Sequence, residues 1–249
     1  MKKILTAILA LALCASVAVA ASGCGCEKDK KTAKNTTSTS SGPGYKVEPT
    51  SPDFEEGAFG FYRLNDNEVK VTVYNGKDKK VEIPETANGA KVTVVGANLF
   101  QGSDIESVKL PASVTEIQQH AFASCQNLTE VNFPEGLKVI GENAFWNCKK
   151  LETIKLPASL KKIGWYAFSA TGVKTLSLPE SKTLSTLNNK LFFQCADLKE
   201  VTIPITITNI ADDTFEQCAD GMTIKAYTGS YAVSYAKSHK INLEEMPRS

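Results

Sequence analysis

The sequence predicts a β-rich solenoid, a right-handed stack of coils with short helical turns, an N-terminal strand cap and a C-terminal helix cap. One observation is an apolar residue followed by proline, which recurs at Ile83-Pro84, Leu110-Pro111, Phe133-Pro134, Leu156-Pro157, Leu178-Pro179 and Ile203-Pro204. Another is a phenylalanine after each proline, which gives the predicted repeat core as Phe100, Phe122, Phe145, Phe168, Phe192 and Phe215. A fixed period of this kind is typical of stacked-repeat architectures.

The repeating unit is clearest from Leu128 to Cys148, and the next unit begins 23 residues after the first, at Leu151. Its first apolar residues predict a short strand, which proline ends because it cannot donate to a β-ladder. A second apolar pair forms the return wall, and an Ala-Phe dipeptide predicts a tight helical turn whose phenylalanine fills the coil. One unit alone cannot cover this apolar side, so we expect its stability to come from stacked neighbours.

Residues 1–23 predict a secretory signal peptide. Lys2 and Lys3 make a basic start, a nearly uninterrupted apolar run extends to Ala21, and small residues precede Cys24. The alternative is a membrane-spanning helix, which needs about 20 apolar residues with anchoring flanks. The run is slightly short and is followed by Gly-Cys-Gly-Cys, which favours a cleaved signal.

The residues Ala21-Ser22-Gly23-Cys24 resemble the bacterial lipobox, although that pattern prefers leucine where Ala21 stands. The resemblance implies that Cys24 is lipidated and begins the mature chain, whereas Cys14, which follows Leu13, fits the pattern less well. Acyl chains contribute about 0.8 kcal/mol per buried methylene, so several of them would hold the protein at a membrane. We therefore expect an exported chain, lipid-anchored at the cell membrane or outer surface.

The composition divides the mature chain into four parts. Residues 24–57 predict the lipidated cysteine and a disordered Ser/Thr/Lys linker, because this stretch has too few apolar side chains to offset its ordering entropy. The parts that follow are the strand cap over 58–95, the repeats over 96–226 and the C-terminal cap over 227–249.

Charge and motifs limit the function classes. Without Lys2 and Lys3, the 28 basic residues become 26 against 27 acidic ones, so no basic excess is present to bind nucleic acid. The sequence contains neither a nucleophile elbow nor a phosphate-binding glycine loop nor a zinc-protease motif. We therefore expect no enzyme, no catalytic residues, no cofactor and no metal site.

The repeat resembles the BspA-like leucine-rich repeat family of bacterial surface proteins. The hallmark Leu-Pro-x-Ser-Val/Leu-x-x-Ile-Gly-x-x-Ala-Phe-x-x-Cys-x-x-Leu is seen at 110–128, with Gln118 in place of glycine, and at 133–151. The resemblance also covers the first strands, with Asn75-Gly76 as a hairpin turn signal, and the closing helix, with Ser230 as its N-cap. Altogether it spans about residues 65–245 and implies a cell-surface protein.

Four cysteines, Cys125, Cys148, Cys195 and Cys218, share one repeat position. Metal ligands converge from short spacings, which these cysteines lack. Neighbouring coils lie roughly 4.8 Å apart, so bridges between Cys125 and Cys148, or Cys195 and Cys218, stay open as alternatives. Because Ser103 and Thr171 also occupy this position, we expect mainly small, buried, unpaired side chains.

The predicted surface has a polar face and an aromatic edge. The outward strand positions are mostly short and polar with mixed charge, whereas hot spots of binding favour Trp, Tyr and Arg. Aromatic residues gather beside the Ala-Phe turns, and the candidate binding edge is Trp146, Trp165, Tyr166, Phe193 and, one coil earlier, His120. Exposed apolar patches usually mark interaction sites, although these rings could instead cover the coil ends.

We therefore expect a protein-binding or adhesion module directed at host matrix or other cells. Its partners would be an extracellular or envelope protein and, through the lipid anchor, a membrane. The alternatives are a structural or scaffold component of a cell-envelope complex and a glycan-binding lipoprotein that uses the aromatic edge as its stacking platform.

Overall fold

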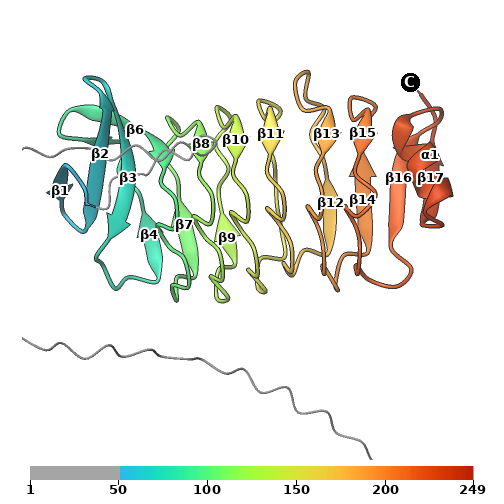
Figure 1. The fold of residues 1–249 in the computed structure, drawn as a ribbon, viewed down its shortest axis with the longest axis horizontal. Coiled ribbons are helices and arrows are strands. Elements are labelled where there is room, and N and C mark those ends of the chain that lie inside the picture. Colours follow the sequence, from blue (N-terminus) through green and yellow to red (C-terminus); the bar gives the residue numbers. More distant parts are fainter. Residues whose placement is uncertain (1–50, 249) are drawn as a thin grey trace, which may run out of the picture. The chain divides into compact units, whose positions relative to one another are not determined.

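The computed structural model describes residues 51–248, which form a stack of coils that follow one another in sequence order (Figure 1). The predicted β-rich solenoid is confirmed, whereas the signal peptide and Cys24 lie outside the described residues. The elements are β1 (Phe54–Glu56), β2 (Phe59–Asn65), β3 (Glu68–Tyr74), β4 (Lys80–Glu82), β5 (Thr86–Ala87), β6 (Ala90–Val95), β7 (Ser107–Lys109), β8 (Glu116–Ile117), β9 (Glu130–Val131), β10 (Val139–Ile140), β11 (Lys162–Ile163), β12 (Thr175–Ser177), β13 (Thr186–Leu187), β14 (Glu200–Ile203), β15 (Asn209–Ile210), β16 (Thr223–Tyr227), α1 (Tyr231–Ser238) and β17 (Asn242–Met246).

The stack begins with an antiparallel region. β1 pairs with β2, β2 with β3, and β5 with β6. Asn88 and Gly89 connect β5 to β6 with positive φ angles of 46° and 77°, the backbone that a tight type I′ hairpin requires. β6 then pairs in parallel with both β3 and β8, so it joins this region to the repeats.

The hairpin predicted at Asn75-Gly76 is wrong. β3 ends just before these residues, yet β4 pairs with β7, whereas β3 pairs with β2 and β6. The segment is therefore a corner at which the chain passes from one wall of the stack to the other. The ring of Tyr74 lies beside Gly76, so a larger side chain at this corner would displace that ring.

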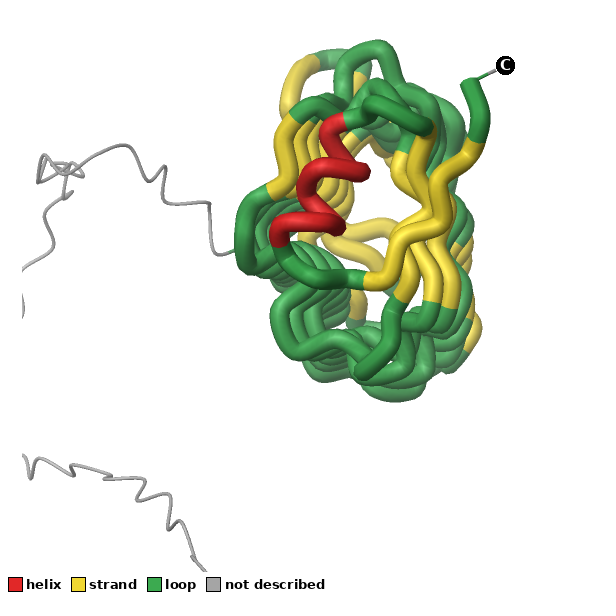
Figure 2. Tube along the Cα trace, turned by 90° about the vertical axis from the view of Figure 1, so that its right-hand side faces the viewer, coloured by secondary structure: helices red, strands yellow, loops and turns green. Residues whose placement is uncertain are grey.

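Each regular coil contributes one short parallel strand to each of two walls. The first wall holds β4, β7 and β9 and, after a break, β12, β14, β16 and β17. The second wall runs from β6 through β8 and β10 to β11, and β13 and β15 follow after a break. Figure 2, a view along the stack, shows the coils one behind another.

The Ala-Phe turns form a third line of hydrogen bonds between coils. His120 and Ser124 have positive φ angles of 56° and 60°, and equivalent positions in the following coils repeat them. From one turn, N–H groups of His120, Phe122 and Ser124 donate to carbonyls of the next turn over 2.9, 2.8 and 2.7 Å. Within the turn, Ala123 N–H donates to the His120 carbonyl over 3.0 Å, the spacing of a 3₁₀ turn.

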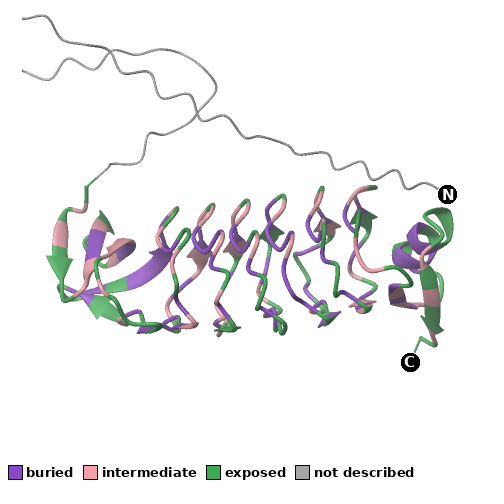
Figure 3. Ribbon diagram, turned by 90° about the horizontal axis from the view of Figure 1, so that it is seen from below, coloured by how far each residue is buried: buried purple, intermediate pink, exposed green. Residues whose placement is uncertain are grey.

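The six repeat phenylalanines named from the sequence form one stack through the core. Each is at most 6% exposed. Successive ring centroids lie 5.4, 4.9, 5.3, 6.0 and 5.5 Å apart, and the ring planes are within 18° of parallel. Figure 3 shows buried residues in each successive coil, as a continuous core requires.

The repeat cysteines bind the turns together without forming disulfides. All four cysteines of the described residues are free. Cys125 Sγ donates to the Phe100 carbonyl over 2.9 Å, and Cys148 Sγ donates to the Phe122 carbonyl over 3.1 Å. Thr171 keeps a donor at this position by bonding Phe168 O over 2.8 Å. The position therefore selects a small side chain that also carries a hydrogen-bond donor.

The C-terminal cap ends the core with an aromatic side chain. Tyr235 of α1 meets the Phe215 ring at 6.2 Å, and its hydroxyl donates to the Ala211 and Asp212 carbonyls over 3.3 and 3.2 Å. Ser230 precedes α1 at the predicted N-cap position, but its hydroxyl makes no cap hydrogen bond and is buried without a partner. Within residues 51–248 no helix is long and apolar enough to cross a membrane.

Replacing Phe145 with alanine tests the stack. This ring is fully buried between two parallel neighbours, so we expect the free energy of unfolding to fall by about 3–5 kcal/mol. Chemical denaturation followed by circular dichroism measures the loss. The exposed Glu142→Ala variant is the control, expected within about 0.5 kcal/mol of the unaltered chain. Equal stabilities for both variants would contradict a stacked core.

Stability should also depend on pH through Cys148. Burial raises the pKa of this thiol well above its ordinary value, so the unfolded chain, with a thiol pKa of about 8.5, ionises first. The stabilisation by neutral Cys148 is therefore complete below about pH 8.5 and is lost as pH rises further. We expect a slope of up to about 1.4 kcal/mol per pH unit from this thiol. The slope should be shallower in Cys148→Ser, and an unchanged slope would refute this role.

Candidate functional site

Both tryptophans of the chain lie exposed on the turn edge of neighbouring coils. Trp146 is 40% exposed and Trp165 is 53% exposed. Their backbones are held in the turn ladder, because the Trp146 carbonyl accepts from Ser124 N–H over 2.7 Å and the Trp165 carbonyl accepts from Asn143 N–H over 2.9 Å. The edge therefore presents two large rings on a fixed backbone.

The turn geometry decides which side chains meet between coils. In two places the residue before the Ala-Phe pair, or before its Leu-Phe equivalent, contacts the residue that follows the phenylalanine in the next coil. Tyr166 and Phe193 meet in this way, with ring centroids 6.3 Å apart and planes at 82°, and Lys190 Nζ lies 4.0 Å from Glu216 Oε2. His120 and Trp146 occupy the corresponding two positions earlier in the stack.

Lys190, which the sequence analysis did not single out, covers part of the predicted edge. Its Nζ lies 4.9 Å from the Phe193 ring centroid and 5.7 Å from that of Tyr166, within the range of a cation–π contact. Its backbone N–H donates to Asp213 Oδ1 over 3.2 Å. Lys190 occupies the repeat position of His120 and Tyr166, so the repeat alignment could have found it.

The structure therefore separates the five residues predicted for the edge. Tyr166 and Phe193 form a half-buried cluster under Lys190. The two tryptophans stay open, and the ring contacts found within residues 51–248 include neither of them. His120 is half-buried in the same turn row, one coil before Trp146.

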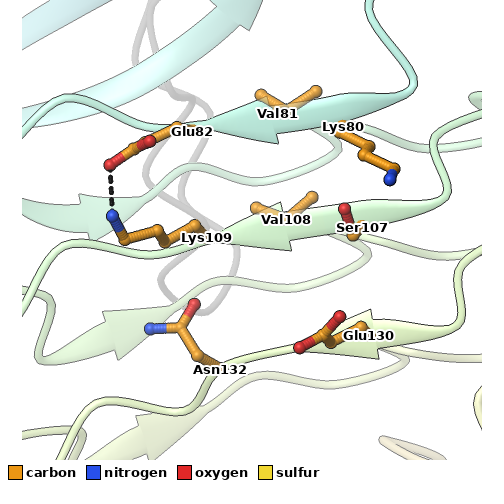
Figure 4. Close-up of a pocket in the computed structure, with 8 residues that line it drawn as sticks. All are labelled: Lys80, Val81, Glu82, Ser107, Val108, Lys109, Glu130 and Asn132. Carbon is orange, nitrogen blue, oxygen red and sulfur yellow. Dashed lines mark hydrogen bonds and ion pairs between the residues drawn. The ribbon is translucent and has the colours of Figure 1, made fainter.

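The strand face of the first wall carries paired charges. Lys109 Nζ on β7 lies 2.5 Å from Glu82 Oε1 on β4 (Figure 4). Lys79 and Glu106 pair at 3.0 Å, a contact that lowers the pKa of the Glu106 carboxyl. Further along, Lys225 contacts both Glu200 and Glu244, at 3.1 and 3.3 Å. These exposed pairs contribute little stability, and they leave the strand face nearly neutral.

The first wall opens where the coil from Leu151 to Pro157 contributes no strand. A groove of about 640 Å³ lies there, with Phe133, Glu135 and Lys155 among its lining residues. Phe133 replaces the aliphatic residue usual before the repeat proline and packs edgewise on Phe145, with centroids 5.4 Å apart. The groove is lined by both polar and apolar side chains, and the tryptophans are not among them.

One serine, histidine and aspartate group lies beside the C-terminal cap. Ser238 Oγ is 3.0 Å from His239 Nδ1, and His239 Nε2 is 3.5 Å from Asp212 Oδ1. However, both the Ser238 hydroxyl and His239 Nδ1 also contact the Tyr235 carbonyl, at 2.9 and 3.0 Å. These contacts close the C-terminal end of α1 and attach it to the preceding coil. Because His239 Nδ1 also contacts the Tyr235 carbonyl, it is not free to act as a base for Ser238 alone. In the described part of the chain no group of acidic, cysteine and histidine side chains could hold a metal ion.

Comparison with known proteins agrees with this repeat architecture. Among solved structures, the chain is similar to a leucine-rich repeat protein of T. pallidum, with 24% identity, a TM-score of 0.58, and coverage of 75% of this chain and 95% of that chain. A leucine-rich repeat protein from Bacteroides ovatus gives 20% identity, a TM-score of 0.53, and coverage of 78% of this chain and 67% of that one. The pneumococcal vaccine antigen PcpA gives 18% identity and a TM-score of 0.58, with coverage of 80% of this chain and 50% of the antigen.

At these identities the likenesses show the fold alone. No curated protein matches the sequence significantly. The model of the BspA type leucine rich repeat region matches six copies over residues 93–220, just over half of the 249 residues. The protein therefore belongs to the BspA-type leucine-rich repeat family.

Proposed function

We propose that this protein is a surface-exposed lipoprotein whose repeats bind another protein, in adhesion to host matrix or to other cells. The two exposed tryptophans carry the proposal. Trp146 and Trp165 lie in successive coils on one edge, 40% and 53% exposed. Tryptophan is enriched in binding hot spots, and exposed apolar groups that gather on one surface usually mark an interaction site.

The other surfaces of the repeats offer fewer anchors. On the strand face, lysines such as Lys109 and Lys225 are already paired with glutamates of neighbouring coils. Such paired charges favour specificity over affinity. The Tyr166 and Phe193 rings are partly covered by Lys190. The tryptophan pair is thus the part of the surface best suited to anchor a partner protein.

Glycan binding is the second candidate for the same edge. A tryptophan ring on a fixed backbone could also stack against a sugar, and the open faces of Trp146 and Trp165 favour this alternative over an enzyme. A scaffold role in a cell-envelope complex would use the same edge for a different protein. These candidates differ in which probe binds and in whether free sugar competes.

We extend the proposal to the attachment of the protein. Cys24, outside the described residues, would carry acyl chains that hold the repeats at a membrane after export. The linker predicted over 24–57 would then act as the spacer between membrane and repeats up to β1, which begins within it at Phe54.

The double variant Trp146→Ser/Trp165→Ser tests the binding edge. We expect at least a tenfold loss of binding to an immobilised extracellular-matrix extract, equivalent to about 1.4 kcal/mol, measured by surface plasmon resonance. The melting temperature should change by less than about 2 °C, because exposed side chains contribute little stability.

Tyr231→Ser is the matched control, since Tyr231 is an aromatic residue 44% exposed on the C-terminal helix. It should bind as the unaltered chain does. If free monosaccharides compete with this binding, the edge binds glycans rather than protein. A large fall in melting temperature of the tryptophan variant would show instead that the rings belong to the core.

Replacement of Cys24 with serine tests the anchor. We expect loss of metabolic palmitate labelling and release of the protein from the membrane fraction, because the acyl acceptor is gone. Cys26→Ser, two residues away, is the control and should keep both the label and the membrane association. Labelling that survives in Cys24→Ser would place the acyl group on another residue.

A further inference from the structure

The thiols of neighbouring coils come close together at the shared cysteine position. The γ atoms at this position lie 3.6 Å apart between Ser103 and Cys125, and 3.4 Å apart between Thr171 and Cys195. Cys195 and Cys218 continue the same column, and their side chains lie close enough for each to shift the pKa of the other. Each thiol also donates to the phenylalanine carbonyl of the preceding coil, over 3.2 and 3.1 Å.

The two cysteine pairs of the column differ in access. Cys125 and Cys148 are both fully buried. Cys195 is also fully buried, but Cys218 is only half-buried. Cys218 lines an open pocket of about 320 Å³ where the last turn meets the C-terminal cap. A small reagent can therefore reach Cys218 directly, whereas the thiols of Cys125, Cys148 and Cys195 are closed to it.

The two pairs also differ in how readily they ionise. Burial raises the pKa of Cys148 well above its ordinary value. In the second pair, the interaction between the two sulfurs lowers the pKa of Cys195 and raises that of Cys218, and the Thr171 hydroxyl lowers the pKa of Cys195 further. Because the two sulfurs share the remaining proton, the charge belongs to the pair, and either sulfur can carry it. Thiolate is the form that reacts with disulfides.

We propose that Cys195 and Cys218 form an oxidisable thiol pair, a modification site for low-molecular-weight disulfides such as glutathione disulfide. The sulfur of Cys218, as thiolate, attacks the disulfide and releases one glutathione thiolate, which leaves a mixed disulfide on Cys218. The sulfur of Cys195 then attacks the Cys218 sulfur, forms the bond between the coils and expels the second glutathione. Two protein thiols are oxidised, one disulfide is reduced to two thiols, and both protons pass to glutathione or solvent.

The geometry favours a reversible bond. A disulfide needs sulfurs about 2.05 Å apart, so the two coils must approach further than the spacing seen between γ atoms in this column. The last turn can shift because it borders the open pocket beside Lys240 and Ile241. A strained bridge is more easily reduced again.

Peptide mapping of the full chain after native treatment with glutathione disulfide tests the pair. Trypsin places each thiol in a separate peptide: Cys125 in 110–138, Cys148 in 139–149, Cys195 in 191–199 and Cys218 in 200–225. We expect peptides 191–199 and 200–225 to be recovered joined, with the loss of two hydrogens. Cys125 and Cys148 should stay reduced and alkylate only after unfolding. Dithiothreitol should reverse the link.

Two serine variants separate the steps, since serine occurs naturally at this position as Ser103. Cys195→Ser should accumulate a glutathione adduct on Cys218, and the control Cys125→Ser should leave the link unchanged. Free thiols on Cys195 and Cys218 after treatment would overturn the proposal. So would an adduct that never resolves in the unaltered chain, or oxidation of Cys125 and Cys148 at the same rate.

Discussion

The structure depends on one constraint: a single coil cannot cover its own apolar side or satisfy its own backbone. The coils meet this constraint by repeating one phenylalanine at the spacing of hydrogen-bonded chains. Successive Phe rings lie 4.9–6.0 Å apart, close to the roughly 4.8 Å between neighbouring strands. Backbone pairing and ring stacking therefore have the same period, and each supports the other. Tyr74 and Tyr235 continue the aromatic line into the two caps, where they contact the rings of Phe59 and His239.

The irregular coils show which part of this arrangement is essential. Both strand walls break beside the coil that carries Thr171. Side chains bridge the second break, where Asn188 and Ser181 donate to carbonyls of the preceding coil over 2.5 and 2.7 Å. The turn ladder continues through the same place, because Phe168 N–H still donates to the Leu191 carbonyl over 3.1 Å. The turn edge is thus the most continuous surface, and it is where the tryptophans lie.

The shared cysteine position is structural in the inner coils, whereas at the last turn of the stack its thiol is accessible to reagents. Whereas the Thr171 hydroxyl donates to the Phe168 carbonyl of its own turn, Cys125 and Cys148 are sealed in the core and donate to phenylalanine carbonyls of the preceding coil. Cys218 makes the same hydrogen bond, but it stands at the last turn, where no further regular coil covers it. A solenoid therefore gives its terminal repeat a chemistry that identical inner repeats lack, because only the terminal one meets solvent.

The sequence by itself determined the period, the buried phenylalanines and the family, because stacking forces the same side chain into the same place in every coil. It also located the aromatic residues on the turn edge, but it could not show that Lys190 covers Tyr166 and Phe193 while both tryptophans stay open. Nor could it show that Asn75-Gly76 is a corner, because local turn preference does not reveal which strands pair. Contacts between coils decided these features, since the Lys190 contact with Tyr166 and the pairing of β4 with β7 join residues more than 20 positions apart in the sequence.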